Sequence, residues 1–507
     1  MDYQYEWLPP GVFVTQELIE ECANLFSNHY GFWSAKSKIN PGEKIQFAPQ
    51  MIKKRLSSDE VRLATARYNN VLIGYAIAIQ KKLKDVGTIS WVTQFVVHKD
   101  HRENGVGKNL LFSIWSFSDH FAWGLVSANP YAVRALEKAT RRRCVPVRIK
   151  KNKIKLINFG ENHIDYINDS LEHKINNLES SINTQFYVDH TNLNNMIDNV
   201  TSSHKPWELG GLDEGWEWFA FTFNDQTQIS LTPEEIEKML QTTDQVTRQA
   251  YSRMRTDMGS HAWTKHTEQE CRFIVEWCSL KEGDRIVDFG CGNGRHIKIL
   301  TDMGMMTTGV DYNKLSDSVV NEISLRGSQF IIGDCRQIKL QEKYNAVICL
   351  YDVIGSYVDQ KENISILENI YYHLKVKGRA LISVMNYELT EYRARNKFSL
   401  ELKPDAILTL PASQIMETTG DIFDPKYYLI DEKTHVIYRK EQFQKGHQLP
   451  VELIVRDRRY CKHEIKKMCE SVGFKVLWAK FVRAGGWSES LSNIDERAKE
   501  ILVLCEK

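Results

Sequence analysis

The chain has 507 residues, of which 42% are hydrophobic and 26% are charged, and this balance is typical of a folded globular protein rather than a disordered or fibrous one. At about 150 residues per domain, this length predicts two to four domains. The 66 Lys and Arg residues nearly cancel the 65 Asp and Glu residues, so the formal net charge is +1 and no overall field attracts nucleic acid or an anionic membrane.

The ten cysteines are scattered, without a Cys-x-x-Cys pair or a Cys/His cluster at zinc-finger spacing. The opening residues MDYQYEWLPPG are acidic and aromatic where a signal peptide carries positive charge and then an apolar run. No stretch approaches the roughly 18 uninterrupted apolar residues of a membrane helix. We therefore expect reduced thiols, no metal site, no membrane span and a cytoplasmic protein.

The first half has the pattern of a mixed α/β unit. Strand-like segments are followed by a glycine-bearing loop and by a helical pattern in NLLFSIWSF, whose apolar residues share one face. Residues 150–204 are rich in Asn and Ser and have weak periodicity. The expected strands are VRLATARY (61–68), VLIGYAIAI (71–79), TISWVTQFVV (88–97), WGLVSA (123–128) and GWEWFAFTF (215–223).

A new unit is expected after residues 224–231. In LTPEEIEKML, Thr232 can cap a helix, Pro233 suits the first helical position and Glu235 completes a capping box. We therefore place one domain at 1–228, with a core at about 61–145, and a second domain at 229–507.

Strands and helices alternate in the second half, which predicts a parallel sheet. A long interruption follows Asn386 and contains a hairpin pattern around residues 431–434. The expected strands are RIVDFG (285–290), TTGVDY (307–312), QFIIGDC (329–335), YNAVICLY (344–351), GRALISVMN (378–386), FKVLWAKFV (474–482) and EILVLCEK (500–507).

Three glycines, Gly290, Gly292 and Gly294, follow the first of these strands, where open α/β sheets bind ligands. Their G-x-G-x-G spacing differs from the dinucleotide fingerprint G-x-G-x-x-G. Asp311 ends the next strand about 20 residues later, where a carboxylate can accept hydrogen bonds from both ribose hydroxyls. Asp334 ends the third strand, where it can accept from an adenine amine while a neighbouring backbone N–H donates to the ring.

The segments VDFGCGNG, GVDYN, IIGDC and YNAVICLYDVIGSY, in this order, resemble the class I S-adenosylmethionine-dependent methyltransferases over residues 232–507. The resemblance implies a doubly wound, Rossmann-like seven-stranded sheet with a final antiparallel strand, and S-adenosylmethionine as cofactor. Asp288 would orient the glycine loop or reach the methionine amino group. The implied cofactor contacts are Asp288, Gly290, Gly292, Gly294, Asp311, Asp334, Cys335 and Leu350.

The methyl acceptor is expected to be a small molecule. Residues 351–355 differ from the Asn/Asp-Pro-Pro-Tyr/Phe block of nucleic-acid amino-methyltransferases, and the insertion at about 387–460 is long enough for a β-rich cover over the substrate. Tyr351, Asp352 and Tyr357 are candidates for binding or deprotonating the acceptor, the alternative being that they pack the loop after the fourth strand. Arg255, His261 and Trp263 are expected to close over the methionine end of the cofactor.

In the first half, a glycine turn lies between a strand and a helix, where free N–H groups and the helix dipole suit a pyrophosphate. Together with VTQFVVHKDHR before it and Asn129 after it, this turn resembles the GNAT superfamily of acyl-CoA N-acyltransferases over residues 61–139. In that superfamily the strand before the loop splays and binds the pantetheine arm. The implied acetyl-CoA (or other acyl-CoA) contacts are Phe95, Val96, Val97, Arg102, Asn104, Gly105, Val106, Gly107, Lys108 and Asn129.

This half departs from the superfamily at Leu136, where many relatives place a tyrosine as acid for the departing thiolate; Tyr131 lies on a different helical face. Because a thiol has a pKa of about 8.5, its thiolate leaves without much protonation near neutral pH. Catalysis and a non-catalytic acyl-CoA-binding or scaffold role therefore both stay open. The basic run at 141–156 is expected to be a solvated strand face, a contact for the coenzyme A phosphate, or an RNA contact.

Together these patterns predict an α/β protein with an N-terminal mixed GNAT-like sheet and a C-terminal methyltransferase sheet carrying a β-rich insertion. The leading hypothesis is a bifunctional enzyme that N-acetylates and methylates a small metabolite. The alternatives are a methyltransferase with a non-catalytic first half, and a modifier of RNA or protein. Nucleic acid is not the expected partner, and a homo-oligomer is compatible with the sequence.

Overall fold

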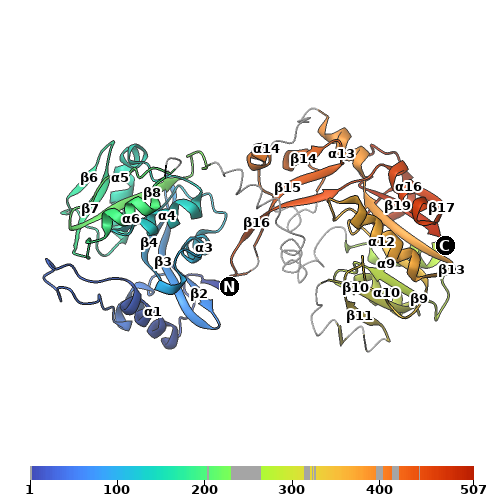
Figure 1. The fold of residues 1–507 in the computed structure, drawn as a ribbon, viewed down its shortest axis with the longest axis horizontal. Coiled ribbons are helices and arrows are strands. Elements are labelled where there is room, and N and C mark those ends of the chain that lie inside the picture. Colours follow the sequence, from blue (N-terminus) through green and yellow to red (C-terminus); the bar gives the residue numbers. More distant parts are fainter. Residues whose placement is uncertain are drawn as a thin grey trace. The chain divides into compact units, whose positions relative to one another are not determined.

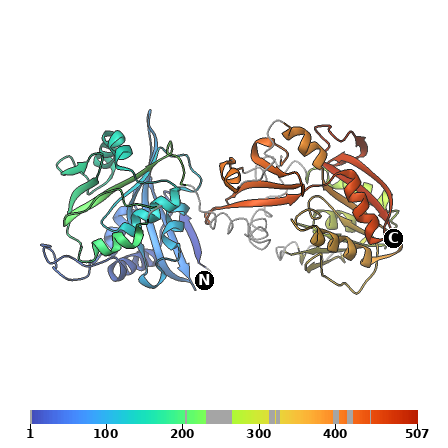
Figure 2. The same cartoon turned by 45° about the horizontal axis from the view of Figure 1, so that its top comes forward.

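The computed structural model describes residues 3–202, 205–229, 264–312, 320–321, 324, 327–395, 404–413, 422–444 and 446–507 (Figures 1 and 2). It divides into two compact units, Met1–Ser230 with Gln444–Pro450, and Leu231–Phe443 with Val451–Lys507. The expected helix at Thr232 and the residues Arg255, His261 and Trp263 lie outside the described residues. Within the described residues, no helix is long and apolar enough to cross a membrane.

The first unit is built on a mixed sheet with the order β1-β2-β3-β4-β5-β8-β7-β6, in which only β4 and β5 are parallel neighbours among the described pairs. The strands are β1 (Gln4–Leu8), β2 (Val61–Tyr68), β3 (Val71–Leu83), β4 (Gly87–Val97), β5 (Ala122–Ser127), β6 (His173–Ile175), β7 (Ser180–Phe186) and β8 (Gly215–Phe223). The helices are α1 (Gln16–His29), α2 (Pro49–Arg55), η1 (Lys99–His101), α3 (Val106–Trp115), α4 (Pro130–Thr140), α5 (Pro146–His163) and α6 (Leu193–Val200).

The alternation of side chains along the strands gives this sheet two buried faces. Leu63, Tyr75 and Ile77 pack with α1 and α2 on one face. The small residues Ala76 and Ala78 belong to the other face, which packs with α3, α4 and α5. The helical layers on both faces of the sheet can be followed in Figures 1 and 2.

Strand β4 separates from β5 halfway along its length. Only Ile89–Val92 of β4 pair with β5, although β4 stays paired with β3 as far as Val97. The register of β3 against β4 shifts between Ile77 and Ala78, whose partners are Gln94 and Val92, so that Thr93 is the extra residue of a bulge. Beyond this bulge, the edge of β4 that faces β5 has no strand partner among the described residues.

The basic run at 141–156 is helical from Pro146 onward and is not the strand face that we expected. Helix α4 ends at Arg141, which adopts the left-handed conformation, and α5 begins with Pro146 at its first position. The reason is the apolar spacing, because Ile149 and Leu156 lie seven residues apart, fall on one helical face and are both buried in the core. The cationic side chains lie along the remaining faces.

The second unit contains a sheet with the order β11-β10-β9-β12-β13-β19-β17-β18. The five strands β11, β10, β9, β12 and β13 are parallel to one another, as strand–helix alternation predicted, and the last strand is antiparallel, as the family resemblance implied. This last strand, β19, lies between β13 and β17. The sheet has eight strands rather than seven because β18 forms a hairpin with β17 at the edge. The strands are β9 (Arg285–Phe289), β10 (Met306–Asp311), β11 (Gln329–Ile332), β12 (Tyr344–Cys349), β13 (Leu374–Met385), β17 (Lys475–Arg483), β18 (Gly486–Leu491) and β19 (Glu500–Glu506).

Helices cover both faces of this sheet. On one face α12 and α16 pack over residues such as Val347 and Val503, and on the other face α9 packs over Ile348 and Leu502. The described helices are α9 (Thr267–Trp277), α10 (Arg295–Asp302), α12 (Gln360–His373), α13 (Tyr387–Ala394), α14 (Pro404–Thr409), η4 (Pro425–Tyr427) and α16 (Lys462–Val472).

The insertion contains a three-stranded antiparallel sheet of β14 (Tyr428–Asp431), β15 (Val436–Phe443) and β16 (Val451–Arg458), which includes the expected hairpin at 431–434. Buried ion pairs join residues of β15 and β16 to Arg459, which follows β16. Arg439 and Arg459 share the carboxylate of Asp457, with N–O distances of 3.1 and 3.0 Å. Arg459 also donates to the hydroxyl of Thr390 and to the carbonyl of Ile422.

Candidate active sites

The glycine turn of the second unit joins β9 to α10. Gly290, Gly292 and Gly294 all have positive φ, at 77°, 60° and 77°. A Cβ on Gly290 would lie 2.3 Å from Cγ2 of Val353, so the turn could not hold a side chain there without moving its neighbour. Gly294 is the N-cap of α10 and makes no side-chain capping hydrogen bond, and the N–H of Arg295 donates to Oδ1 of Asn293 at 3.3 Å.

Asp311 ends β10 and faces this turn. Its Oδ2 accepts a hydrogen bond of 2.8 Å from the backbone N–H of Gly292. The structure thus brings together the carboxylate and the glycines that the sequence predicted to share a site. A carboxylate oxygen has further acceptor capacity, so Asp311 can hold the turn and still accept from a ribose hydroxyl.

Asp288, one residue before the end of β9, is the buried acid of this site. It is 4% exposed, and its Oδ2 has no hydrogen-bond partner among the described residues. Burial, with the nearby charge of Asp311, raises the pKa of Asp288 to about 7. The same Oδ2 lies 3.8 Å from Nδ1 of His296. A buried carboxyl with an oxygen that makes no hydrogen bond, beside a glycine turn, fits a ligand that carries an ammonium group, such as the methionine end of S-adenosylmethionine.

Asp334 is bound to the side chain of Arg336. The guanidinium Nε lies 3.0 Å from each carboxylate oxygen, and the backbone N–H of Arg336 donates to Oδ1. Arg336 also pairs with Glu362 and lies 4.4 Å above the ring of Tyr357. Tyr357 therefore packs beside the Asp334 pair. Cys335 and Leu350 are both buried, and burial raises the pKa of the Cys335 thiol.

Tyr351 belongs to a buried network that sequence reasoning missed. Its hydroxyl donates to Oε1 of Glu270 at 2.5 Å, while Arg295 and His296 each lie 2.8 Å from Oε2. Burial opposes ionisation of Glu270, but the His296 hydrogen bond and the Arg295 charge lower its pKa to about 2. Burial raises the pKa of Tyr351 well above its ordinary value, so this phenol is a hydrogen-bond donor and not a base.

Two further carboxyls lie near this network. Burial and the charge of Asp457 raise the pKa of Asp352. Glu500, the first residue of β19, is 3% exposed, and its Oε2 has no hydrogen-bond partner among the described residues. Sequence reasoning did not single out Glu500.

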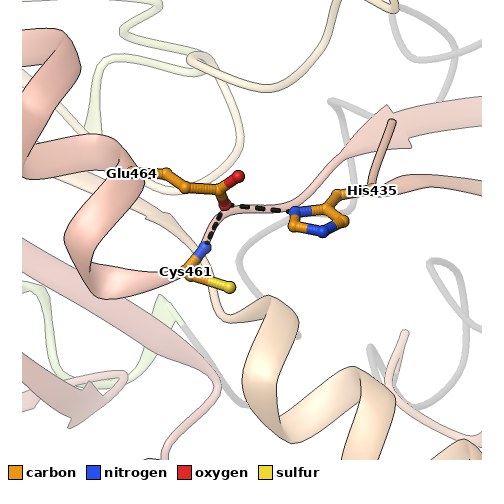
Figure 3. A group of neighbouring side chains, drawn as sticks. All are labelled: His435, Cys461 and Glu464. Atoms are coloured by element: carbon orange, nitrogen blue, oxygen red, sulfur yellow. Dashed lines mark hydrogen bonds and ion pairs between the residues drawn. The ribbon is translucent and has the colours of Figure 1, made fainter. Parts of the chain in front are cut away.

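One group in the described part of the chain has the composition of a metal site: His435, Cys461 and Glu464, whose ligand atoms lie within 4.8 Å of one another (Figure 3). The carboxylate of Glu464 already accepts from the backbone N–H of Cys461 at 2.8 Å and lies 3.1 Å from Nδ1 of His435. This arrangement is the capping box of α16, with His435 tying the β14–β15 turn to it. The cluster therefore has a structural explanation that needs no ion.

The glycine turn of the first unit joins η1 to α3. Gly105 has a φ of 78° and is the N-cap of α3, where it makes no side-chain capping hydrogen bond. Arg102 and Asn104 brace the loop: Arg102 Nε donates to the carbonyl of Val97 at 3.1 Å, and Asn104 donates to the carbonyl of Arg102. Gly107 allows close packing, because a Cβ there would lie 2.8 Å from Cζ of Phe95. Val106 is buried beneath the turn and Lys108 is exposed.

Phe95, Val96 and Val97 all lie on the part of β4 that has separated from β5. This is the splayed strand that the sequence resemblance implied, and on the side that faces β5 it has no strand partner among the described residues, although the carbonyl of Val97 accepts from Arg102. Asn129 has a local role, because its side chain caps α4 by accepting from the N–H of Tyr131. Leu136 is fully buried in the core.

Glu217 is a second acid that sequence reasoning missed. Its neighbour Trp218 pairs with Ser127, the last residue of β5, so Glu217 lies at the end of the sheet where β4 and β5 have parted. It is 6% exposed and accepts a 2.7 Å hydrogen bond from Thr184. Burial raises the pKa of Glu217 to about 7, and its charge in turn helps to raise the pKa values of Tyr30 and Tyr166.

Two domain families match this chain. A methyltransferase domain family matches residues 263–478, and an acetyltransferase (GNAT) domain family matches residues 40–159. The probable S-adenosyl-L-methionine-dependent methyltransferase TehB of Haemophilus influenzae is 26% identical over 112 residues, which are 22% of this chain and 38% of that protein. This chain thus spans well under half the length of that relative.

Similar solved structures include an S-adenosylmethionine-dependent methyltransferase from Clostridium acetobutylicum, with a TM-score of 0.34 and 13% identity over 52% of this chain and 99% of that one. The CcbJ methyltransferase from Streptomyces caelestis has a TM-score of 0.34 and 13% identity over 47% of this chain and 88% of that one.

Proposed function

This chain joins a GNAT acetyltransferase domain to a methyltransferase domain, as both sequence resemblances indicated, and from that premise we propose that it is a bifunctional transferase. In this proposal the first unit transfers an acetyl group from acetyl-CoA to an amine, and the second transfers a methyl group from S-adenosylmethionine to a small molecule. The main support for this proposal is that each unit has a glycine turn with positive φ at the N-terminus of a helix. Each turn lies beside groups that suit the donor proposed for that unit.

In the second unit, S-adenosylmethionine would supply an electrophilic methyl group. The Gly290 turn would admit the donor to the backbone, Asp311 would accept from its ribose and Asp288 would pair with its ammonium group. Asp334 would exchange part of its contact with Arg336 for a hydrogen bond from the adenine amine. Because an in-line displacement needs mainly alignment and exclusion of water, the buried Tyr351–Glu270–Arg295 network would act by holding the site rigid.

In the first unit, acetyl-CoA would supply a thioester carbonyl. The first turn of α3 would bind the pyrophosphate, and the unpaired edge of β4 would bind the amide groups of the pantetheine arm. Glu217 would take a proton from the amine, because it lies at the end of the sheet where β4 and β5 have parted and its raised pKa of about 7 gives it affinity for that proton at neutral pH. A thiolate leaves without an acid, so Leu136 is compatible with this chemistry.

Leu136 also favours a second candidate, in which the first unit binds acyl-CoA without catalysis. Equilibrium binding of S-adenosylmethionine and of acetyl-CoA to the full chain separates the cases. Gly107→Val should abolish acetyl-CoA binding, because the new side chain meets Phe95 at the turn, and should leave S-adenosylmethionine binding unchanged. Gly211→Val is the control, since nothing lies within 4 Å of a Cβ at Gly211.

The chemistry of the first unit is tested by release of coenzyme A from acetyl-CoA across a panel of primary amines. If the wild type releases coenzyme A and Glu217→Gln does not, the result supports catalysis by the first unit. If the wild type binds acetyl-CoA but releases no coenzyme A with any amine, the result supports the second candidate. Failure of the wild-type chain to bind either donor would overturn both.

A further inference from the structure

The second unit has a buried carboxyl, Glu500, that the proposed donor site does not use. Glu500 opens β19, where it pairs with Met385 of β13 and with Val482 of β17. Because β19 runs antiparallel to β13, its first residue lies where β13 ends. This is also the edge of the sheet at which β9 and β10 end in Gly290 and Asp311.

The register decides which face of the sheet Glu500 occupies. Directly paired residues of neighbouring strands point to the same side, and so do residues two apart along one strand. Glu500 therefore shares its face with Leu502, which packs with α9, and with Ser383. Ser383 makes a hydrogen bond with Glu500 and also accepts from the backbone N–H of Tyr351. Glu500 is thus next to the Tyr351–Glu270 network.

Two negative groups, Glu270 and Asp352, and one positive group, Arg295, act on Glu500. Asp352 is itself acted on by the negative Asp457 and by the positive Arg439 and Arg459. Glu270 of α9 is ionised, Asp352 follows β12, and Arg295 of α10 is the cation among the charged groups that act on Glu500. Burial keeps His296 neutral, with a pKa lowered to about 4. Burial first, and then the charge of Glu270, raise the pKa of Glu500 to about 8. An added cation would relieve this excess of negative charge.

We propose that Glu500 and Asp352 bind the methyl acceptor of the second unit, and that this acceptor is an amine which enters as an ammonium ion. The proposal rests on the proposed use of S-adenosylmethionine by this unit. The amine is expected to carry a hydrocarbon or aromatic group, because an apolar cluster adjoins the acids. That cluster consists of Met385, Leu389, Ile422 and Phe423, with Tyr351 and Tyr427 packed against it.

The chemistry of this arrangement balances. Binding of the ammonium ion expels the proton of Glu500 to solvent, and the resulting carboxylate then takes one proton from the ammonium ion, which frees the nitrogen lone pair. That pair forms the new N–C bond to the methyl group, and the C–S bond breaks with its electrons remaining on sulfur, which gives S-adenosylhomocysteine. The methylated nitrogen leaves as an ammonium ion, and the proton on Glu500 passes to solvent. A phenolate or carboxylate acceptor would instead bring a further negative charge to the same acids.

Sinefungin tests the proposal without knowledge of the acceptor, because it carries a primary amine where S-adenosylmethionine carries its transferable methyl group, and S-adenosylhomocysteine carries neither. A charge-assisted hydrogen bond to that amine should make the wild-type chain prefer sinefungin over S-adenosylhomocysteine by about tenfold or more. Glu500→Gln should reduce this preference to about onefold without changing the affinity for S-adenosylhomocysteine. Glu500→Asp should keep part of it.

Glu506→Gln is the matched control, because Glu506 lies at the other end of the same strand and pairs with Arg379. Calorimetry in buffers of different ionisation enthalpy gives a second measurement. Sinefungin should release close to one proton on binding the wild type at pH 7, and none on binding Glu500→Gln.

A sinefungin preference that survives in Glu500→Gln, or an equal loss of affinity for both ligands, would overturn the assignment. If the wild type binds neither ligand, the failure lies with the proposed methyl donor itself.

Discussion

Gly290 is the residue on which the methyl donor site depends most directly. Gly290→Ala should weaken S-adenosylmethionine binding more than tenfold, because a Cβ would collide with Val353 at a φ of 77° and displace the turn. Isothermal titration measures the effect. Gly283→Ala is the control, because Gly283 has a φ of 83° but no atom within 4 Å of its Cβ, so it adds strain without a collision. Equal affinities in the two variants would contradict the role given to Gly290.

Glu217 should make the stability of the first unit depend on pH. Its pKa rises from 4.5 in the unfolded chain to about 7 in the fold. Between these values the folded state holds a proton that the unfolded state has lost, so stability is fully present below pH 4.5 and falls as the pH rises to about 7. The free energy of unfolding of the first unit should fall by roughly 3 kcal/mol over this pH range.

Denaturant unfolding at pH 5 and pH 8 should therefore show Glu217→Gln gaining stability relative to the wild type at the higher pH. Glu214→Gln, which changes a partly exposed carboxyl of the same segment, should follow the wild-type curve. A Glu217→Gln curve parallel to that of the wild type would contradict the burial of this charge.

At this scale the sequence revealed the residues that have a motif around them. Gly290 and Asp311 could be placed because a strand, a turn and a spacing identify them together. No sequence motif surrounds Glu217, Glu270 or Glu500, since each is a single glutamate on a strand or helix. Their burial comes from elements far away in the chain, as when Gly485 donates its N–H to Glu270. Of these three glutamates, only Glu217 could have been noticed in the sequence, because it interrupts the apolar run GWEWFAFTF.

At the scale of elements, the parallel order of the second sheet followed from strand–helix alternation, and the antiparallel final strand followed from the family resemblance. The edge strand β18 did not follow, because a short hairpin partner has weak periodicity. The basic run at 141–156 shows how charge can mask apolar spacing. Its many Lys and Arg residues suggested a solvated strand, while Pro146 and the seven-residue interval from Ile149 to Leu156 determine a helix.

The three-stranded sheet of the insertion should depend on its buried ion pairs. Arg459→Met removes a guanidinium that pairs with Asp457 and also donates to Thr390 and Ile422. Because these partners stay buried, we expect a loss of about 3 kcal/mol in the free energy of unfolding of the second unit, measured with urea. Arg497→Met removes an exposed ion pair and should stay close to the wild type. Equal stability of the two variants would show that the buried network contributes little.

At the scale of the whole molecule, each unit has its own apolar cores, such as the cluster around Trp91 in the first and the cluster around Val347 in the second. Units with separate cores are expected to unfold as separate cooperative transitions. A ligand that binds one folded unit stabilises only that unit, by about 2.7 kcal/mol when its concentration is 100 times its Kd.

Calorimetric unfolding of the full chain should therefore show two transitions, one raised by S-adenosylmethionine and the other by acetyl-CoA. Gly290→Ala should remove the first shift and keep the second, and Gly107→Val should do the reverse. If either donor raised both transitions together, the two units would fold as one cooperative body and their donor sites would be thermodynamically linked. Independent shifts would mean that each donor site belongs to one independently folding unit. A metabolite that receives both groups would then have to pass from one site to the other.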